Sequence, residues 1–334
     1  MMSTQPLVSV AVPVYNGERY LRATLDSILN QTWRNLELII CDNCSTDGTE
    51  KICREYAERD PRVRYFRADR NLGPARNFNR AVPLARGRYL KWNAADDLCA
   101  PTFIEECVAM LEADTSLVLA YPRTIQIDSE GKEVGRVEYQ PTYDRQRAWR
   151  RLARLLFVDH RRHGAHELYG VIRLDWLNKT SLCGAHVRAD SVLLAKLALL
   201  GGFGQVEQYL FLNRDHNDRS SRTQGQRYVR AGSRLSAWIG AGPLPPAEWW
   251  DSAMKGRIVF PEWRVMLEYG RAIHETWMAP LTRARCYGVF ALYVLRHLPK
   301  LARDVVIAAE QFVRRLPSLI RFHREPNATA HAQP

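Results

Sequence analysis

The sequence predicts an α/β fold in which a doubly wound, mostly parallel sheet is followed by a helical C-terminal region. Strand and helix patterns alternate four times within about the first 100 residues, which is typical of a parallel sheet with helices on both faces. The composition then changes near Gly240, where aromatic and basic helical patterns replace the strands. The 334 residues suffice for one large domain or two ordinary ones.

The predicted strands are short apolar runs, each bounded by residues that favour turns. They cover residues 7–16, 36–41, 63–66 and 89–93. The first is rich in β-branched side chains, which is consistent with a strand buried on both faces. The expected organisation is a domain over residues 1–221 with halves 7–123 and 124–221, a linker over 222–252, a basic helical region over 253–324 and a disordered tail over 325–334.

Polar side chains stand where each predicted strand ends. They are Asn16, Asp42, Asn71 and the adjacent pair Asp96 and Asp97. Because open α/β sheets bind ligands beyond the carboxyl ends of their strands, these side chains are expected to line one crevice. Carboxylate oxygens there suit Mg²⁺ or Mn²⁺ carrying a diphosphate. The alternative for Asp96 and Asp97 is a solvated turn that caps the following helix.

Several classes of protein are disfavoured by the sequence. No G-x-G-x-x-G follows the first strand and no GxxxxGK[ST] occurs, which argues against dinucleotide oxidoreductases and P-loop enzymes. The seven scattered cysteines fit a reducing cytoplasm better than a disulfide framework. The polar start, Met1 to Pro6, does not resemble a signal peptide, and no apolar run approaches the ~20 residues of a membrane span. A cytoplasmic protein is expected.

The net charge of +12 favours a polyanionic partner, for which nucleic acid, an anionic membrane and a phosphorylated small molecule are the candidates. Nucleic acid is disfavoured, because the basic residues are dispersed and no nucleic-acid motif occurs.

Four motifs in order resemble those of family 2 glycosyltransferases, which have the GT-A fold. They are PVYN at residues 13–16, DNCSTDGT at 42–49, NLGPARN at 71–77 and NAADD at 93–97. The last three are similar to that family's D-D-x-S-x-D-x-T, N-x-G-x-x-x-A-R-N and D-x-D-D segments, and the match covers roughly residues 7 to 221. Asn43 and Ala94 depart from it, since each replaces an acid of the family pattern.

The resemblance implies that a nucleoside-diphosphate sugar binds across the strand ends. Pro13 and Tyr15 would pack around a base that Asp42 reads, and Arg76 would lie near the diphosphate. Asp96 would contact Mg²⁺ or Mn²⁺, with the site weakened because Ala94 removes a carboxylate. The expected donor-binding residues are Pro13, Tyr15, Asn16, Asn71, Asp42, Arg76, Asp96, Asp97, Arg214 and His216.

The second half supplies the remaining candidates. Asp190 is expected in the first turn of a helix, and the resemblance makes it the general base, although Ala189 replaces the usual preceding Glu. The segment ending in Arg214 and His216 is similar to the family's strand into Tyr-Arg-x-His, below the diphosphate. Residues 166–173 are read as a strand under the acceptor site, with His166 as an acceptor contact.

The function that the resemblance implies is transfer of a sugar, with inversion, to a hydroxyl of a polysaccharide, lipid-linked or small-molecule glycan. The alternative is a sugar-nucleotide-binding protein without transferase activity, which the loss of an acid at Ala94 motivates. Asp190 and the segment from Arg214 to His216 argue against that alternative.

The C-terminal helices allow two interpretations. From Ala253 to Pro326 there are thirteen Lys and Arg against six Asp and Glu, and the apolar runs 286–295 and 305–309 are bordered by arginine. Such helices could lie on an anionic membrane surface, and the protein would then be a peripheral protein on the inner face of the membrane. The alternative is a lobe that packs its apolar face on the first domain and leaves its arginines in solvent.

Overall fold

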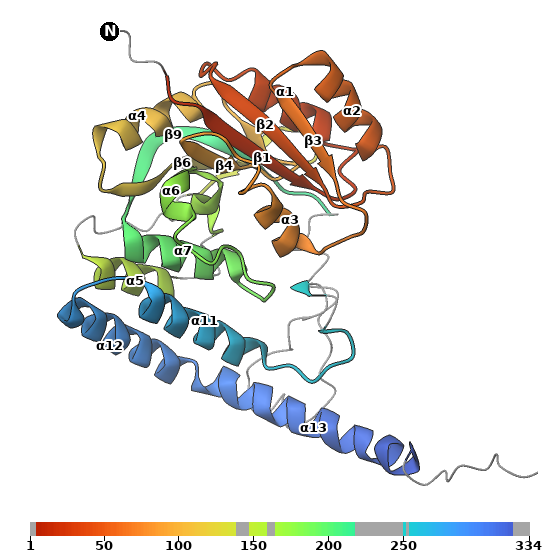
Figure 1. Ribbon diagram of the computed structural model, residues 1–334, viewed down its shortest axis with the longest axis vertical. Helices are drawn as coiled ribbons and strands as arrows, with labels where there is room; N and C mark the ends of the chain where they lie inside the picture. Colours follow the sequence, from red (N-terminus) through yellow and green to blue (C-terminus); the bar gives the residue numbers. More distant parts are fainter. Residues whose placement is uncertain (1–4, 138–146, 159–163, 218–249, 252–253, 323–334) are drawn as a thin grey trace, which may run out of the picture.

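A computed structural model describes residues 5–137, 147–158, 164–217, 250–251 and 254–322 (Figure 1). Within these ranges the predicted α/β fold is confirmed, with helices on both faces of a central sheet and a helical C-terminal region. The predicted linker lies almost entirely outside the described residues, and the predicted tail lies wholly outside them. The domain boundary at residue 221 therefore stays a prediction.

The N-terminal half of the sheet consists of four parallel strands. In spatial order they are β3 (Val63–Arg67), β2 (Leu36–Asp42), β1 (Val8–Val14) and β4 (Tyr89–Trp92). The register pairs Val14 with Asp42, so the carboxyl ends of β1 and β2 lie together at one edge. Every residue of β1 is buried, as its β-branched composition predicts.

Beyond β4 the sheet becomes mixed. The strand β8 (Val171–Arg173) runs antiparallel to β4 and to β6 (Leu117–Ile127), and β6 pairs in parallel with β9 (Gly202–Arg214). The short strands β5 (Leu98–Cys99) and β7 (Glu133–Arg136) pair with β9 and β6. Because Leu98 pairs with Leu212, the end of β9 lies beside the chain that carries Asp96 and Asp97.

Helices cover both faces of the sheet, and side chains alternate between the two cores. Val10 and Val12 of β1 point into the core with α1 (Leu21–Leu29), α2 (Thr49–Arg59) and α4 (Phe103–Ala113). Ala11 points into the other core, which contains α3 (Pro74–Arg80), α5 (Ala148–Leu156), α7 (Ala189–Leu200) and the short α6 (Leu174–Leu177).

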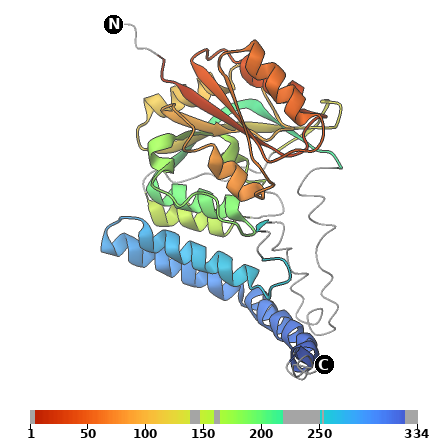
Figure 2. The same ribbon diagram turned by 45° about the vertical axis from the view of Figure 1, so that its right-hand side comes forward.

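The C-terminal helices form a further layer below α5 and α7 (Figures 1 and 2). They are α11 (Pro261–Glu275), α12 (Pro280–Arg296) and α13 (Leu298–Phe322). α11 packs on α7, α12 packs on α5, and α13 contacts α11. Among the described helices, none is both long enough and apolar enough to cross a membrane.

Candidate functional site

The ends of β1 and β2 are joined by hydrogen bonds from a single asparagine. Asn16 adopts the left-handed backbone conformation, with φ of 53°, which Asn tolerates better than most residues. Its backbone N–H donates to the Ser45 hydroxyl at 2.9 Å, and its side-chain Oδ1 accepts from the Thr46 N–H at 2.8 Å. Asn16 therefore holds the loop after β2 against the end of β1, while the preceding Tyr15 is left exposed.

Asp42 is fully buried at the end of β2 and accepts hydrogen bonds at both carboxylate oxygens. Oδ1 accepts from the N–H and the hydroxyl of Ser45, at 2.9 and 2.6 Å. Oδ2 accepts from the Tyr65 hydroxyl at 2.8 Å and lies 3.3 Å from Arg67 Nε. Burial, followed by the hydrogen bond to Asp42, raises the pKa of Tyr65 and keeps it a donor. A nucleotide base that contacts Asp42 would have to share its carboxylate oxygens with these hydrogen bonds, so the role of Asp42 in reading the base stays a prediction.

Asn43 links the loop after β2 to the predicted motif at Asn71. Its Nδ2 donates to Asn71 Oδ1 at 2.9 Å and to the Gly73 carbonyl at 3.4 Å, while its Oδ1 accepts from the Leu72 N–H at 2.8 Å. A carboxylate, which only accepts hydrogen bonds, could not make the first two contacts. The replacement of an acid by Asn43 is thus matched by its surroundings.

Asn71 and Arg76 remain accessible at this edge. Asn71 is exposed after β3, and Gly73 has a positive φ of 80° at the turn into α3. Arg76 lies exposed on α3, and among the described residues it has no hydrogen-bond or ion-pair partner. A cation in that state is available to an anionic ligand.

Asp96 and His216 are brought together from positions 120 residues apart. Asp96 Oδ2 lies 2.8 Å from His216 Nε2, and the Asp96 side chain is 28% exposed whereas that of His216 is 7% exposed. The imidazole packs against the Tyr20 ring at 4.7 Å. Its buried Nδ1 has no hydrogen-bond partner among the described residues.

This pair can support a weak divalent site. A carboxylate oxygen suits Mg²⁺ or Mn²⁺, and Mg²⁺ commonly takes only one or two carboxylates together with substrate phosphates. No group of three or more His, Cys, Asp or Glu residues positioned to hold a metal occurs within the described residues. The residues present therefore fit a metal that depends on a bound diphosphate for most of its ligands.

Asp97 is only 2% exposed and serves the fold at this point. Its Oδ1 accepts from the Arg214 N–H at 2.7 Å, and both its oxygens lie 3.1 Å from Asn213 Nδ2. These bonds fasten the end of β9 to the chain that carries Asp96. Because β9 leads to His216, Asp97 sets the position of the Asp96–His216 pair.

Arg214 is buried and directed at backbone carbonyls. Its Nε donates to the Asp96 carbonyl at 2.9 Å, and its Nη1 donates to the carbonyls of Asp128 and Ser129, each at 3.0 Å. The guanidinium also lies over the Tyr20 ring at 4.8 Å. The predicted donor contacts of Arg214 and Asp97 stay predictions, and the structure adds a supporting role for both.

Asp190 lies in the first turn of α7, as predicted. The segment before α7 is tied to α3 by two hydrogen bonds between Asn79 and Cys183, at 2.8 and 3.1 Å. α3 begins beside the Asn43–Asn71 contact, so the start of α7 lies on the same side of the molecule as the ends of β1 and β2 (Figure 1). Asp190 is partly exposed there.

The prediction of a single strand over residues 166–173 is wrong. His166 to Tyr169 form a 3₁₀ helix, and the strand β8 begins only at Val171. Ala165, just before it, has a positive φ of 52°, which turns the chain out of an extended path. His166 packs edge-on against the Phe211 ring at 5.8 Å, and its predicted role in acceptor binding stays a prediction.

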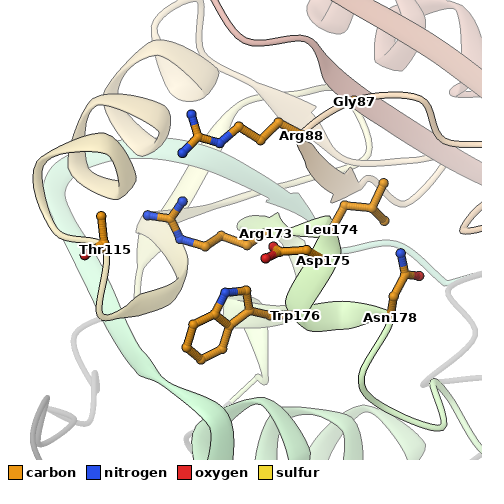
Figure 3. Close-up of a pocket in the computed structure, with 8 residues that line it drawn as sticks. All are labelled: Gly87, Arg88, Thr115, Arg173, Leu174, Asp175, Trp176 and Asn178. Carbon is orange, nitrogen blue, oxygen red and sulfur yellow. The ribbon is translucent and has the colours of Figure 1, made fainter.

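A cavity of about 520 Å³ lies at the opposite, amino end of β4 (Figure 3). Arg88, Arg173 and Trp176 are among its lining residues. The buried Arg173 guanidinium is already occupied, because it donates to the Leu117 carbonyl at 2.8 Å, to the Leu111 carbonyl and to the Tyr89 hydroxyl at 3.2 Å. This cavity is therefore separate from the strand-end site and offers an anion little free charge at its base.

Three residues that build the site were not predicted from the sequence. They are Tyr65, Arg67 and Asn213. Tyr65 and Arg67 are two residues apart on β3, so both point to the same face, and this alternation was a usable signal. Asn213 gave no comparable signal, because its partner Asp97 lies 116 residues away.

A mixed, mostly parallel sheet with helices on both faces is the arrangement of GT-A glycosyltransferase folds, and this chain has that fold. Residues 9–167 match the model for glycosyl transferase family 2, and this part of the chain belongs to that family.

Curated relatives share the N-terminal part of the chain. A chondroitin synthase of Escherichia coli is 37% identical over 142 residues, which are 42% of this chain and 21% of that protein. A putative glycosyltransferase EpsE of Bacillus subtilis is 39% identical over 112 residues, which are 33% of this chain and 40% of that protein. The chain thus spans less than half the length of these relatives.

Among solved structures, the chain is similar to S. aureus TarS 1–349 in complex with UDP, with a TM-score of 0.52 and 15% identity. That similarity covers 92% of this chain and 91% of TarS 1–349, and at this identity it establishes the fold alone.

Proposed function

We propose that this protein is a glycosyltransferase that moves a sugar from a nucleoside-diphosphate sugar to an acceptor hydroxyl, with inversion at the anomeric carbon. The observation that carries the proposal is the strand-end edge of the sheet in the family 2 region, residues 9–167, where His216 lies against Asp96, together with Asp190 at the start of α7. Relatives named chondroitin synthase and hyaluronan synthase support it, as does a fold shared with a structure bound to UDP-GlcNAc.

The donor would lie across the ends of β1, β2 and β4. The exposed ring of Tyr15, with Pro13 behind it, offers a surface for the base at the end of β1. Asn16 and Asn71 flank the loop that Asp42 organises, and Arg76 offers a cation to the diphosphate.

Asp96, with His216 beside it, would hold a divalent cation, Mg²⁺ or Mn²⁺. Such an ion neutralises charge that develops on the leaving nucleoside diphosphate.

Asp190 would accept the proton of the acceptor hydroxyl as that oxygen attacks the anomeric carbon. The positive end of the α7 helix dipole lies beside this carboxylate. A single displacement of this kind forms the bond from the face opposite the leaving group, which inverts the configuration.

The acceptor is proposed to be a growing polysaccharide or a lipid-linked glycan, in line with the relatives named as chondroitin, hyaluronan and teichuronic acid enzymes. A cytoplasmic location, on the inner face of the membrane, fits the cysteines, because all seven are free thiols in the described residues.

The decisive experiment is Asp190→Asn. Transfer should fall by orders of magnitude while nucleoside-diphosphate affinity is kept, because an amide cannot accept the proton. Asp175→Asn is a matched control, since Asp175 is an exposed carboxylate in the first turn of α6, at the opposite edge of the sheet. Unchanged turnover in Asp190→Asn would refute the assignment.

The alternative function is a sugar-nucleotide-binding protein without transferase activity, which Ala94 favours. A wild-type protein that binds donor but neither transfers nor hydrolyses it, across pools of glycan acceptors, would support this alternative.

A further inference from the structure

Exposed apolar side chains are concentrated on the C-terminal helices. Among the described residues, fifteen large hydrophobic side chains are exposed, and twelve of them lie between Phe260 and Val313. Trp277, in the turn before α12, is 93% exposed. This concentration exceeds the scattered exposure that is normal for a protein surface, and it marks an interaction site.

The exposed side of α12 is a continuous apolar stripe. Its members recur every three or four residues and are Leu281, Ala284, Gly288, Leu292 and Leu295. Leu281, Leu292 and Leu295 are each at least 60% exposed. The opposite side of the helix is also apolar, because Cys286 and Tyr293 are fully buried against the rest of the protein. Packing on the protein therefore accounts for one face of α12 and leaves the other unexplained.

α13 continues the stripe. Leu298, Ala302, Val305, Ala309 and Phe312 are exposed at the same helical spacing. In Figures 1 and 2, α11, α12 and α13 together form the layer furthest from the sheet, and no described element covers α12 and α13 from beyond. The two stripes together define the outer face, which is the name used below for these ten residues.

The fully exposed charges of α12 and α13 are all positive among the described residues. On α12 and α13, the exposed charged side chains among those described are Arg285, Arg296 and Arg315. The acidic Asp304 is fully buried, and Glu310 is only partly exposed. A surface of leucine, valine and phenylalanine edged by arginine matches the boundary between lipid headgroups and acyl chains. It matches a second copy of the same arginine-edged face poorly, because like charges would meet.

We infer that the outer face of α12 and α13 binds an anionic lipid bilayer, with both helices lying in the headgroup plane. This inference rests on the proposed function, because a lipid-linked acceptor is what the surface would bring to Asp190. It refines the expectation from the apolar run 286–295, because Cys286 and Tyr293 face inward and only part of that run reaches the lipid.

The test is co-sedimentation of the full chain with vesicles of phosphatidylcholine, alone or mixed with phosphatidylserine, at low and high salt. Binding is expected only to the anionic vesicles and should weaken with salt. Leu292→Gln/Leu295→Gln should reduce partitioning by more than about tenfold, because two side chains lose their insertion into the acyl boundary. Val134→Gln on β7 is the matched control, since Val134 is also 60% exposed.

The charge is tested separately. Arg285→Gln should weaken binding at low salt by about fivefold, which corresponds to one basic residue near an anionic surface. Arg34→Gln, which removes an exposed arginine between α1 and β2, should leave it unchanged.

Two results would overturn the inference. One is equal binding of Leu292→Gln/Leu295→Gln and wild type. The other is a stable dimer that ignores vesicles and dissociates in the same variant, which would make a second copy the occupant. The vesicle assay contains neither donor nor acceptor, so a negative result would not contradict the proposed transfer reaction. Conversely, unchanged turnover in Asp190→Asn would not contradict lipid binding by the outer face.

Discussion

The start of α7, which carries Asp190, is anchored by a buried ionic network from the C-terminal helices. Arg188 precedes α7 in the left-handed conformation, with φ of 56°. Its guanidinium donates to Glu262 of α11 and, at 3.2 Å, to the Tyr293 hydroxyl of α12. Glu262 also lies 3.7 Å from Arg303, which pairs with Asp304 at 3.0 Å, so two carboxylates and two arginines form one network.

Replacing Glu262 by Gln keeps the shape of the side chain and removes its charge. The side chains of Glu262, Arg188 and Arg303 are 7%, 20% and 4% exposed, so the arginines cannot recover their hydration. Breaking a buried pair by changing one partner costs about 3–5 kcal/mol. We take the lower end, about 3 kcal/mol, because Arg188 keeps the Tyr293 hydroxyl and Arg303 keeps Asp304 at 3.0 Å.

The second expected effect is on catalysis. Without the Glu262 carboxylate, Arg188 holds the start of α7 through the Tyr293 hydroxyl alone, so the first turn is less firmly fixed, and Asp190 lies two residues after Arg188. A displacement of about 1 Å in a reacting group can cost on the order of 100-fold in rate. Turnover should therefore fall while the KM for the donor, whose proposed contacts lie elsewhere, stays near the wild-type value.

The assay combines urea unfolding with steady-state transfer. Arg271→Gln is the control on the same helix: its ion pair with Glu268 is largely solvent-exposed at Arg271, and losing it should cost less than about 1 kcal/mol. Arg188→Lys should retain more activity than a neutral substitution at Arg188, because lysine keeps the positive charge but lacks the forked N–H donors of the guanidinium. Wild-type stability together with wild-type turnover in Glu262→Gln would refute this reasoning.

The remaining predictions concern the strand-end site and pH. Asp96→Asn should have the wild-type free energy of unfolding, but its binding of nucleoside diphosphate, measured calorimetrically, should no longer depend on Mn²⁺. Asp97→Asn should lose about 2 kcal/mol of stability, because its amide would face the N–H donors of Asn213 and Arg214. The opposite pattern would show that the roles of the two residues are exchanged. Burial lowers the pKa of His186 in the folded protein, so as the pH falls this residue binds a proton in the unfolded chain before it does in the folded one. The free energy of unfolding should therefore be independent of His186 protonation above about pH 6.5 and should decline below it. In urea titrations between pH 7 and 5, His186→Gln should show a smaller decline than wild type. The same decline in both proteins would contradict this prediction.

Those parts of the protein that follow local rules could be predicted from the order of residues alone. Apolar β-branched runs produced β1 and β2, and a period of two or of 3.6 residues separated strands from helices. The positions of Asn16, Asp42 and Asp96 at or just beyond strand ends followed from the same patterns, because a parallel strand ends near the point where the apolar run stops. Asp190 could likewise be placed at a helix start from its neighbours alone.

Which of these side chains stay accessible depends on how distant segments pack in three dimensions. Asp96 and Asp97 are adjacent in the sequence, yet Asp96 keeps an accessible carboxylate beside His216, whereas the carboxylate of Asp97 is hydrogen-bonded to the end of β9. The same holds for α12, where the apolar run gave no indication that Cys286 points inward while Leu292 points outward. Local patterns cannot predict these differences, because the burial and the hydrogen-bond partners of a side chain depend on segments more than 100 residues away.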